Sequence, residues 1–281
     1  MNQRHQKKQI FRFGEDSMYI FFHGVRGSTA ISSKDNVMFG GNTTCTEVLT
    51  DKYQFFFDAG TGFTNASFCN ETRDIFIIIS HFHHDHIQGL AFNRNLSRTP
   101  KNIFISSALT SSDELKTVIV NYFSDVYFPA KFDEIFPNIE FVDFQNVIRR
   151  LTPEVDIDFI KLNHPGGSSG YSLKTENSKF VVLLDNEFNQ SQNTELIKFC
   201  QNSSLIIWDG MFTDCEIESK RGWGHSTIEE GKKFIQKLKS GKLVVSHHDP
   251  FRSDYELEML EKKFSDERVI FAKDGDVFCF K

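Results

Sequence analysis

The sequence predicts one α/β domain, and three observations lead to that prediction. Short apolar runs separated by Gly, Asn, Asp and Pro predict strands at residues 18–24, 46–58, 74–80, 102–106, 156–163, 171–175, 180–185, 204–209, 242–246, 269–272 and 276–280. Apolar residues at helical spacing predict helices at 112–123, 190–200, 227–239 and 254–264. No repeat, low-complexity tract or linker divides residues 1–281, although residues 1–17 are expected to form a loosely ordered N-terminal extension.

Composition excludes several classes of protein. Hydrophobic residues make up 39% of the chain and charged residues 25%, as in ordinary globular proteins. No apolar run approaches the roughly 20 residues that span a bilayer, and the first residues lack a secretory pattern. We therefore expect no membrane contact and a cytoplasmic location. The five cysteines are scattered and form no CxxC pair, which argues against a disulfide framework and a thiolate zinc site.

The formal net charge of -6 bears on the partner. A protein that grips long nucleic acid usually presents a basic surface that displaces counterions from phosphates. The sequence has no obvious cluster of lysine and arginine. The charge thus favours a small substrate and disfavours long nucleic acid.

Polar residues with metal-binding or acid–base chemistry follow many of the predicted strands. Rigid strand ends are where α/β scaffolds present such side chains. The residues in these positions are Asp58, His81, His164, Asp185, Asp209 and His247.

The strongest motif follows the predicted strand at 74–80. His81, His83, Asp85 and His86 lie within six residues, and His84 adds a further imidazole. On an extended segment His81 and His83 point to the same side, and the chain is expected to turn near Asp85 into a helix starting at Ile87. Neutral imidazole and carboxylate are ligands for zinc and related divalent ions. The alternative is a solvated histidine-rich loop.

Further residues complete the predicted site. His164 precedes a Gly-rich turn, and a carboxylate at Asp185 would be costly to bury unless it were paired or bound to metal. Of His247 and His248, only one is expected to face the site, because neighbours on an extended chain point oppositely. We assign His247 as the ligand and His248 as a supporting residue. Asp58 is expected to orient the ligand loop from behind the ligands.

His225 is a candidate for contact with a phosphate or oxyanion. Ser226 and Glu229 have the spacing of a capping box, which predicts a helix starting at Thr227. His225 would then lie at a helix N-terminus, which favours anions. Asp209 could hydrogen-bond to one ring nitrogen and set the tautomer of His225. The alternative is a packing histidine.

Together these motifs resemble the metallo-β-lactamase superfamily and, within it, the ribonuclease Z-like phosphodiesterase branch. The residues that match are His81, His83, Asp85 and His86 of the HxHxDH motif, the single ligands His164, Asp185 and His247, and His225-Ser226-Thr227. The resemblance implies a four-layer αββα sandwich. It also implies one metal at His81, His83 and His164, a second at Asp85, His86 and His247, and Asp185 between them. Members are often dimers, so a homodimer is compatible with the resemblance.

The resemblance and the residues together predict a dinuclear hydrolase. Two divalent ions, zinc with manganese or iron as alternatives, would activate water for attack on a small or cyclic nucleotide or another phosphodiester. Asp85 would help to orient that water, and His225, steered by Asp209, would act on the developing charge or the leaving oxygen. The alternatives are a transfer-RNA 3′-end endonuclease, although no long Gly-rich arm is present, and a carboxyl-ester, thioester or β-lactam hydrolase. A catalytically silent, metal-bearing binding module is the alternative outside enzymes.

Overall fold

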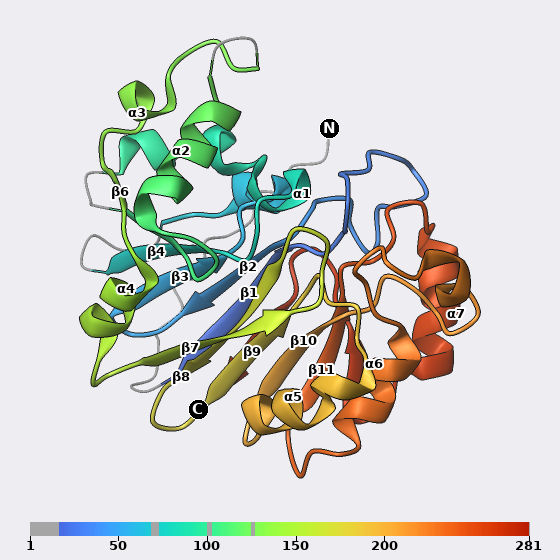
Figure 1. The fold of residues 1–281 in the computed structure, drawn as a ribbon. Coiled ribbons are helices and arrows are strands. Elements are labelled where there is room, and N and C mark those ends of the chain that lie inside the picture. The colour runs from blue at the N-terminus through green and yellow to red at the C-terminus, as the bar shows by residue number, and fades with distance from the viewer. Residues whose placement is uncertain (1–16, 69–72, 100–102, 125–126, 281) are drawn as a thin grey trace.

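The computed structural model describes residues 17–68, 73–99, 103–124 and 127–280. The predicted extension at residues 1–17 therefore lies, except for Ser17, outside the described residues. Two mixed sheets face each other (Figure 1). The first, in the order β13-β1-β2-β3-β4-β5-β6, contains β1 (Met18–Gly24), β2 (Cys45–Leu49), β3 (Tyr53–Phe57), β4 (Asp74–Ile79), β5 (Ile103–Ser107), β6 (Ile139–Phe141) and β13 (Val277–Phe280). The second, in the order β12-β11-β10-β9-β8-β7, contains β7 (Asp156–Leu162), β8 (Ser168–Lys174), β9 (Lys179–Leu183), β10 (Leu205–Asp209), β11 (Lys242–Ser246) and β12 (Val269–Phe271).

Helices cover the outer faces of both sheets (Figure 1). On the first sheet lie α1 (His84–Ile87), α2 (Ser112–Tyr122) and α3 (Phe132–Ile135), and on the second lie α5 (Asn193–Cys200), α6 (Ile228–Ile235) and α7 (Asp254–Phe264). Helix α4 (Phe144–Leu151) contacts β5 and β7, one strand from each sheet. This arrangement is the predicted αββα sandwich.

Three clusters of buried apolar side chains hold the four layers together. One fills the space between the sheets with side chains such as Phe55, Phe76 and Phe180. A second lies under α5, α6 and α7, and a third lies under α1, α2 and α3. Inner strands such as β4 and β9 are buried on both faces and read as continuous apolar runs, whereas the edge strand β7 alternates. No helix within the described ranges is long and apolar enough to cross a bilayer.

Strand direction brings the strand ends together. β3, β4, β5 and β6 run parallel to one another, and so do β9, β10, β11 and β12. The carboxyl ends of parallel strands meet at one edge of a sheet. The polar residues that follow these strands therefore gather at a shared edge of the sandwich.

Several predicted elements are corrected. The run at 46–58 is two strands, because Thr50 turns the chain and its amide N–H donates to the Tyr53 carbonyl at 2.9 Å. α1 begins at His84 rather than at Ile87. The capping box of α6 is formed by Thr227 and Glu230, one residue later than predicted. The Ser226 hydroxyl instead donates to the carbonyl of Asn186. β6, α3 and α4 were not predicted.

Candidate metal centre

The motif His81 to His86 leaves β4 and enters α1, so that its side chains turn back over the sheet edge. His83 caps α1 with an extended backbone, and Asp85 and His86 lie in the helix itself. The rings of His81 and His86 have centroids 4.3 Å apart, and those of His81 and His83 are 4.5 Å apart. His84 points away and its ring contacts Tyr122.

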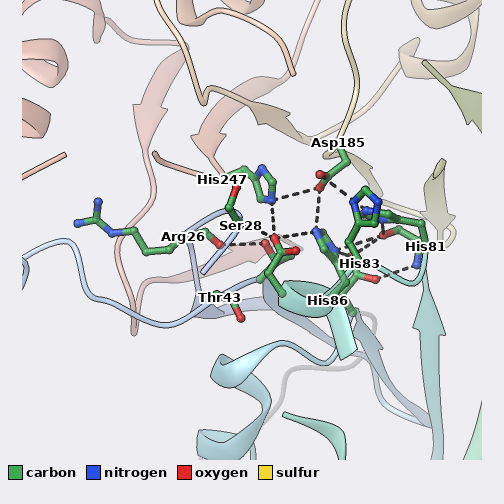
Figure 2. A network of polar contacts seen from close by, with 12 residues as sticks. Arg26, Ser28, Thr43, His81, His83, His86, Asp185 and His247 are labelled. Carbon is green, nitrogen blue, oxygen red and sulfur yellow. Dashed lines mark hydrogen bonds and ion pairs between the residues drawn. The ribbon is translucent and has the colours of Figure 1, made fainter. Parts of the chain in front are cut away.

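Asp185 lies between two groups of imidazoles (Figure 2). Its Oδ1 is 3.5 Å from His164 Nε2 and 3.9 Å from His81 Nε2. Its Oδ2 is 2.9 Å from His86 Nε2 and 3.2 Å from His247 Nε2. A carboxylate whose two oxygens face different sets of nitrogens is placed to bridge two cations.

The structure brings all seven predicted ligands together. His81, His83, His164 and Asp185 form one group whose ligand atoms all lie within 4.8 Å of one another. Asp85, His86 and His247 form a second such group. In the first, His83 Nδ1 and His164 Nε2 are 3.0 Å apart, and in the second, Asp85 Oδ2 is 3.2 Å from His86 Nε2 and 3.3 Å from His247 Nε2. That these groups bind metal stays a prediction.

The donor set fits divalent cations. His81 Nε2, His86 Nε2 and Asp185 Oδ2 are buried and make no aligned hydrogen bond. Leaving buried polar atoms unpaired costs roughly 1–3 kcal/mol each, so such a cluster calls for a partner. Imidazole nitrogen and carboxylate oxygen are donors that zinc and its neighbours accept. The donor set of these two groups is therefore one that divalent cations accept.

The pKa values of the buried side chains shift in different directions across the centre. Burial and the neighbouring His86 hold the pKa of His81 well below its usual range, so this ring is neutral and offers a lone pair. Burial opposes the charge on His86, but the carboxylates of Asp85, Asp185 and Asp58 outweigh it and raise its pKa. Burial likewise opposes ionisation of Asp185, and the surrounding histidines nevertheless lower its pKa. Burial also opposes ionisation of Asp85, but His86 and His247 lower its pKa, so both Asp185 and Asp85 are anionic.

Asp58 lies behind the predicted ligands and hydrogen-bonds to His86 and Ser80. Its Oδ2 accepts from His86 Nδ1 at 2.8 Å and from the Ser80 hydroxyl at 2.9 Å. Its Oδ1 accepts from the Ser80 amide at 2.8 Å. Ser80 Oγ also lies 3.0 Å from His81 Nδ1. A single carboxylate thus orients His86 directly and His81 through one hydroxyl, with the ring nitrogens that face the centre left free.

His225 and Asp209 are paired, as predicted. Asp209 is the last residue of β10, and its Oδ2 lies 2.8 Å from His225 Nδ1. Burial lowers the pKa of His225, but the Asp209 carboxylate outweighs it and raises the pKa to about 9. His225 lies two residues before Thr227, the cap of α6, so its ring is held by Asp209 rather than by the helix end.

His248 does not support the ligands through its side chain, which corrects the prediction. Its Nε2 donates to the Ala272 carbonyl at 2.9 Å, and its ring stacks on Phe271. Burial lowers its pKa to about 3, so it is a neutral core residue. The backbone carbonyl of His248 accepts a hydrogen bond from the Gly27 amide at 3.0 Å and so helps to hold the loop after β1 next to the centre.

The loop after β1 also reaches the centre, although its residues were not predicted to. The amide of Ser28 donates to Asp85 Oδ2 at 2.7 Å (Figure 2). A Cβ on Gly27 would lie 2.8 Å from His247 Cε1 and 2.4 Å from Met211 Cε, so only glycine lets the loop approach this closely. Arg26, behind them, is buried and donates to the carbonyls of Gly40, Asp249 and Arg252. No ligand-type side chain marks this loop, and the arginine and glycine were its only signals.

Comparison with known proteins places the chain in a family. The sequence model described as anti-Pycsar protein Apyc1 matches residues 18–277. The chain belongs to the Apyc1 anti-Pycsar protein family. A comparison with curated protein sequences finds no significant match.

Solved structures agree with the Apyc1-family chain in fold. The metallo-β-lactamase fold protein YhfI from Bacillus subtilis has a TM-score of 0.68 at 18% identity, covering 94% of this chain and 100% of its own. The short form of human tRNase Z has a TM-score of 0.64 at 17% identity, covering 92% and 98%. Yeast PDE1 has a TM-score of 0.63 at 14% identity, covering 94% and 99%. The fold is therefore the metallo-β-lactamase αββα sandwich, as the resemblance implied.

Proposed function

We propose that this Apyc1-family protein is a metal-dependent phosphodiesterase that acts on a small substrate, such as a cyclic nucleotide. The observation that carries the proposal is the position of His225. It lies beside the predicted metal ligands, with its Nδ1 held by Asp209 and 3.8 Å from Asp185 Oδ1. Hydrolysis of a phosphodiester needs both water activation and a proton for the leaving oxygen, and the two parts of the site match these needs.

The ligands divide into two sets on either side of Asp185. His81, His83 and His164 would hold one divalent cation, and Asp85, His86 and His247 a second. When bound there, the cations supply Lewis acidity that polarises a phosphoryl oxygen and lowers the pKa of water. Zinc fits these donors, and manganese and iron accept them as well.

The chain's own groups provide the proton chemistry. Because the Asp209 carboxylate accepts from His225 Nδ1, the other ring nitrogen of His225 is free to donate. His225 thus donates to a phosphoryl oxygen or to the leaving oxygen as negative charge develops. Asp85, held by the Ser28 amide at 2.7 Å, accepts a hydrogen bond from the attacking water.

The experiment is hydrolysis of bis-p-nitrophenyl phosphate and adenosine 3′,5′-cyclic monophosphate by protein loaded with zinc or manganese. We expect turnover of both, and its loss in Asp85→Ala. The metal content of each sample is measured in parallel, so that a lack of turnover is interpreted only for protein that holds both ions. Protein that holds both ions and hydrolyses neither substrate, but cleaves a β-lactam, a thioester or a transfer-RNA precursor, would refute the proposal.

A further inference from the structure

An exposed tryptophan lies next to the candidate centre. The chain has two tryptophans. Trp208 is 1% exposed in the core, whereas Trp223 is 57% exposed. Trp223 precedes His225 by two residues, in the turn 221–224 that follows a 3-10 helix at Ile217–Lys220. A large apolar ring exposed beside a site is a candidate contact for a ligand.

The turn 221–224 is held to the site by hydrogen bonds. Glu187 Oε2 accepts from the amides of Gly222 at 2.7 Å and Gly224 at 3.1 Å. Both glycines have positive φ, +85° and +87°, so the turn needs them. The Gly224 carbonyl accepts from His164 Nδ1 at 2.8 Å. Trp223 is thus placed rigidly relative to a predicted metal ligand.

A row of rings leads from His225 to Trp223. Phe212 has its ring centroid 5.8 Å from that of His225 and 6.4 Å from that of Trp223. Phe212 itself is buried, 3% exposed, so it spaces the two outer rings. Lys220 Nζ lies 4.0 Å from the centroid of the Trp223 ring, where it holds the indole and adds a positive charge. One end of the row is the proposed proton donor and the other is an aromatic surface.

We infer that Trp223, with Lys220, is a platform on which the aromatic base of the substrate stacks. The inference rests on the proposed function. On the proposed function His225 acts on the phosphoryl or the leaving oxygen, so the nucleoside would lie over the surface beside His225, where the ring of Trp223 is exposed. Every base has a π-face, so stacking selects for a base without strongly selecting its identity. Trp223 is thereby a specificity-determining residue that favours nucleotides over phosphodiesters without a base.

The first test compares two substrates on the metal-loaded protein. One is adenosine 3′,5′-cyclic monophosphate, and the other is the same cyclic phosphate with hydrogen in place of the base. Trp223→Ala should lower kcat/KM for the first by roughly 5- to 100-fold, mainly through KM, and leave the second unchanged. Trp223→Phe should restore most of the loss. Tyr255→Ala, which removes an aromatic residue 71% exposed on α7, is the matched control and should have no effect.

Equal losses on both substrates, or no loss on either, would overturn the platform. So would a loss that follows a change in oligomeric state in analytical ultracentrifugation, because Trp223 would then be a contact between copies of the chain. A second readout is independent of turnover. Adenosine 5′-monophosphate should quench tryptophan fluorescence saturably in the metal-loaded protein, and not in Trp223→Phe, which retains only Trp208.

The two readouts separate the two proposals. Protein that hydrolyses no phosphodiester, yet shows quenching that depends on Trp223, would refute the proposed function and support the platform. Protein that hydrolyses the cyclic nucleotide without such quenching would refute the platform and leave the function standing.

Discussion

Asp58 Oδ2 lies 2.8 Å from Nδ1 of His86, and both side chains are buried. The carboxylate fixes the tautomer of the imidazole and leaves Nε2 facing Asp185 at 2.9 Å. Asp58 has a positive φ of 63°, in the left-handed region that non-glycine residues seldom occupy. Asp185, His247 and Ser28 share this conformation, with φ of 56°, 59° and 59°. Strained backbone thus gathers at the candidate centre, as it commonly does at functional sites.

Asp58→Asn should weaken metal binding. The amide cannot accept from His86 and Ser80 as the carboxylate does, so His86 loses its fixed orientation. Loss of such a supporting group typically costs 10- to 100-fold in metal affinity, measured by competition with a chelator. Glu267→Gln, at an exposed carboxylate far along the chain, is the control. Equal affinities in the Asp58 variant and wild type would show that the hydrogen bond does not orient the ligand.

Gly224→Ala and Gly222→Ala form a matched pair. Both glycines have positive φ, so either alanine costs on the order of 1–2 kcal/mol in backbone strain. Only at Gly224 does the new Cβ meet the centre, 2.1 Å from His164 Nδ1, whereas nothing lies within 4 Å at Gly222. We expect both variants to lose stability in urea denaturation, Gly224→Ala more because of the added clash, and a loss of bound metal in Gly224→Ala alone. Full metal content in Gly224→Ala would mean that His164 is not a ligand or can move freely.

Asp209→Asn should impair turnover without emptying the centre. The amide removes the charge that holds His225 Nδ1 at 2.8 Å and allows the wrong tautomer. General acid–base catalysis typically contributes 10²- to 10⁴-fold, and kcat should fall within that range. His225→Ala should cost about as much, and the double variant little more, because the two residues act as a unit. Additive losses, with metal content unchanged throughout, would contradict a shared role.

The positions of the ligands could be predicted because chemistry and strand ends coincide in the sequence. His81, Asp185 and His247 each follow an uninterrupted apolar run, and parallel strands deliver their ends to one edge. The positive φ at Asp185 and His247 could not be predicted, because it arises from the contacts that hold each strand end. The hydrogen bond from the Ser28 amide to Asp85 could not be predicted either, because every residue except proline has a backbone N–H and the sequence does not show which one will point at the site.

Two histidines show the limit of sequence spacing. Alternation on an extended chain predicted that His247 and His248 face different surroundings, and they do, but His247 lies past the end of β11 with a φ of +59°, so strand alternation is not the cause. It could not say that His248 would lie against Phe271 and donate to the Ala272 carbonyl, because β12 comes beside β11 only in the folded sheet. Likewise, Ser226 and Thr227 both offer capping hydroxyls. Tertiary structure decided between them, because the Ser226 hydroxyl donates to Asn186.

Asp274 should make stability depend on pH independently of the centre. Burial raises its pKa from 3.8 to about 6, against hydrogen bonds from Asn42 that lower it. The folded protein therefore keeps a proton that the unfolded chain releases at lower pH. This stabilising contribution is complete below pH 3.8 and is lost as the pH rises to about 6. Asp274→Asn does not titrate and should lack this loss.

The measurement is the free energy of unfolding in urea for wild type and Asp274→Asn across that window. A pKa difference of one unit corresponds to about 1.4 kcal/mol. Wild type should thus lose roughly 2–3 kcal/mol relative to the variant between pH 3.8 and about 6. Titration of the histidines and carboxylates of the centre cancels in the difference, because both proteins share them. A constant difference across the window would mean that Asp274 ionises in the folded protein as readily as in the unfolded chain.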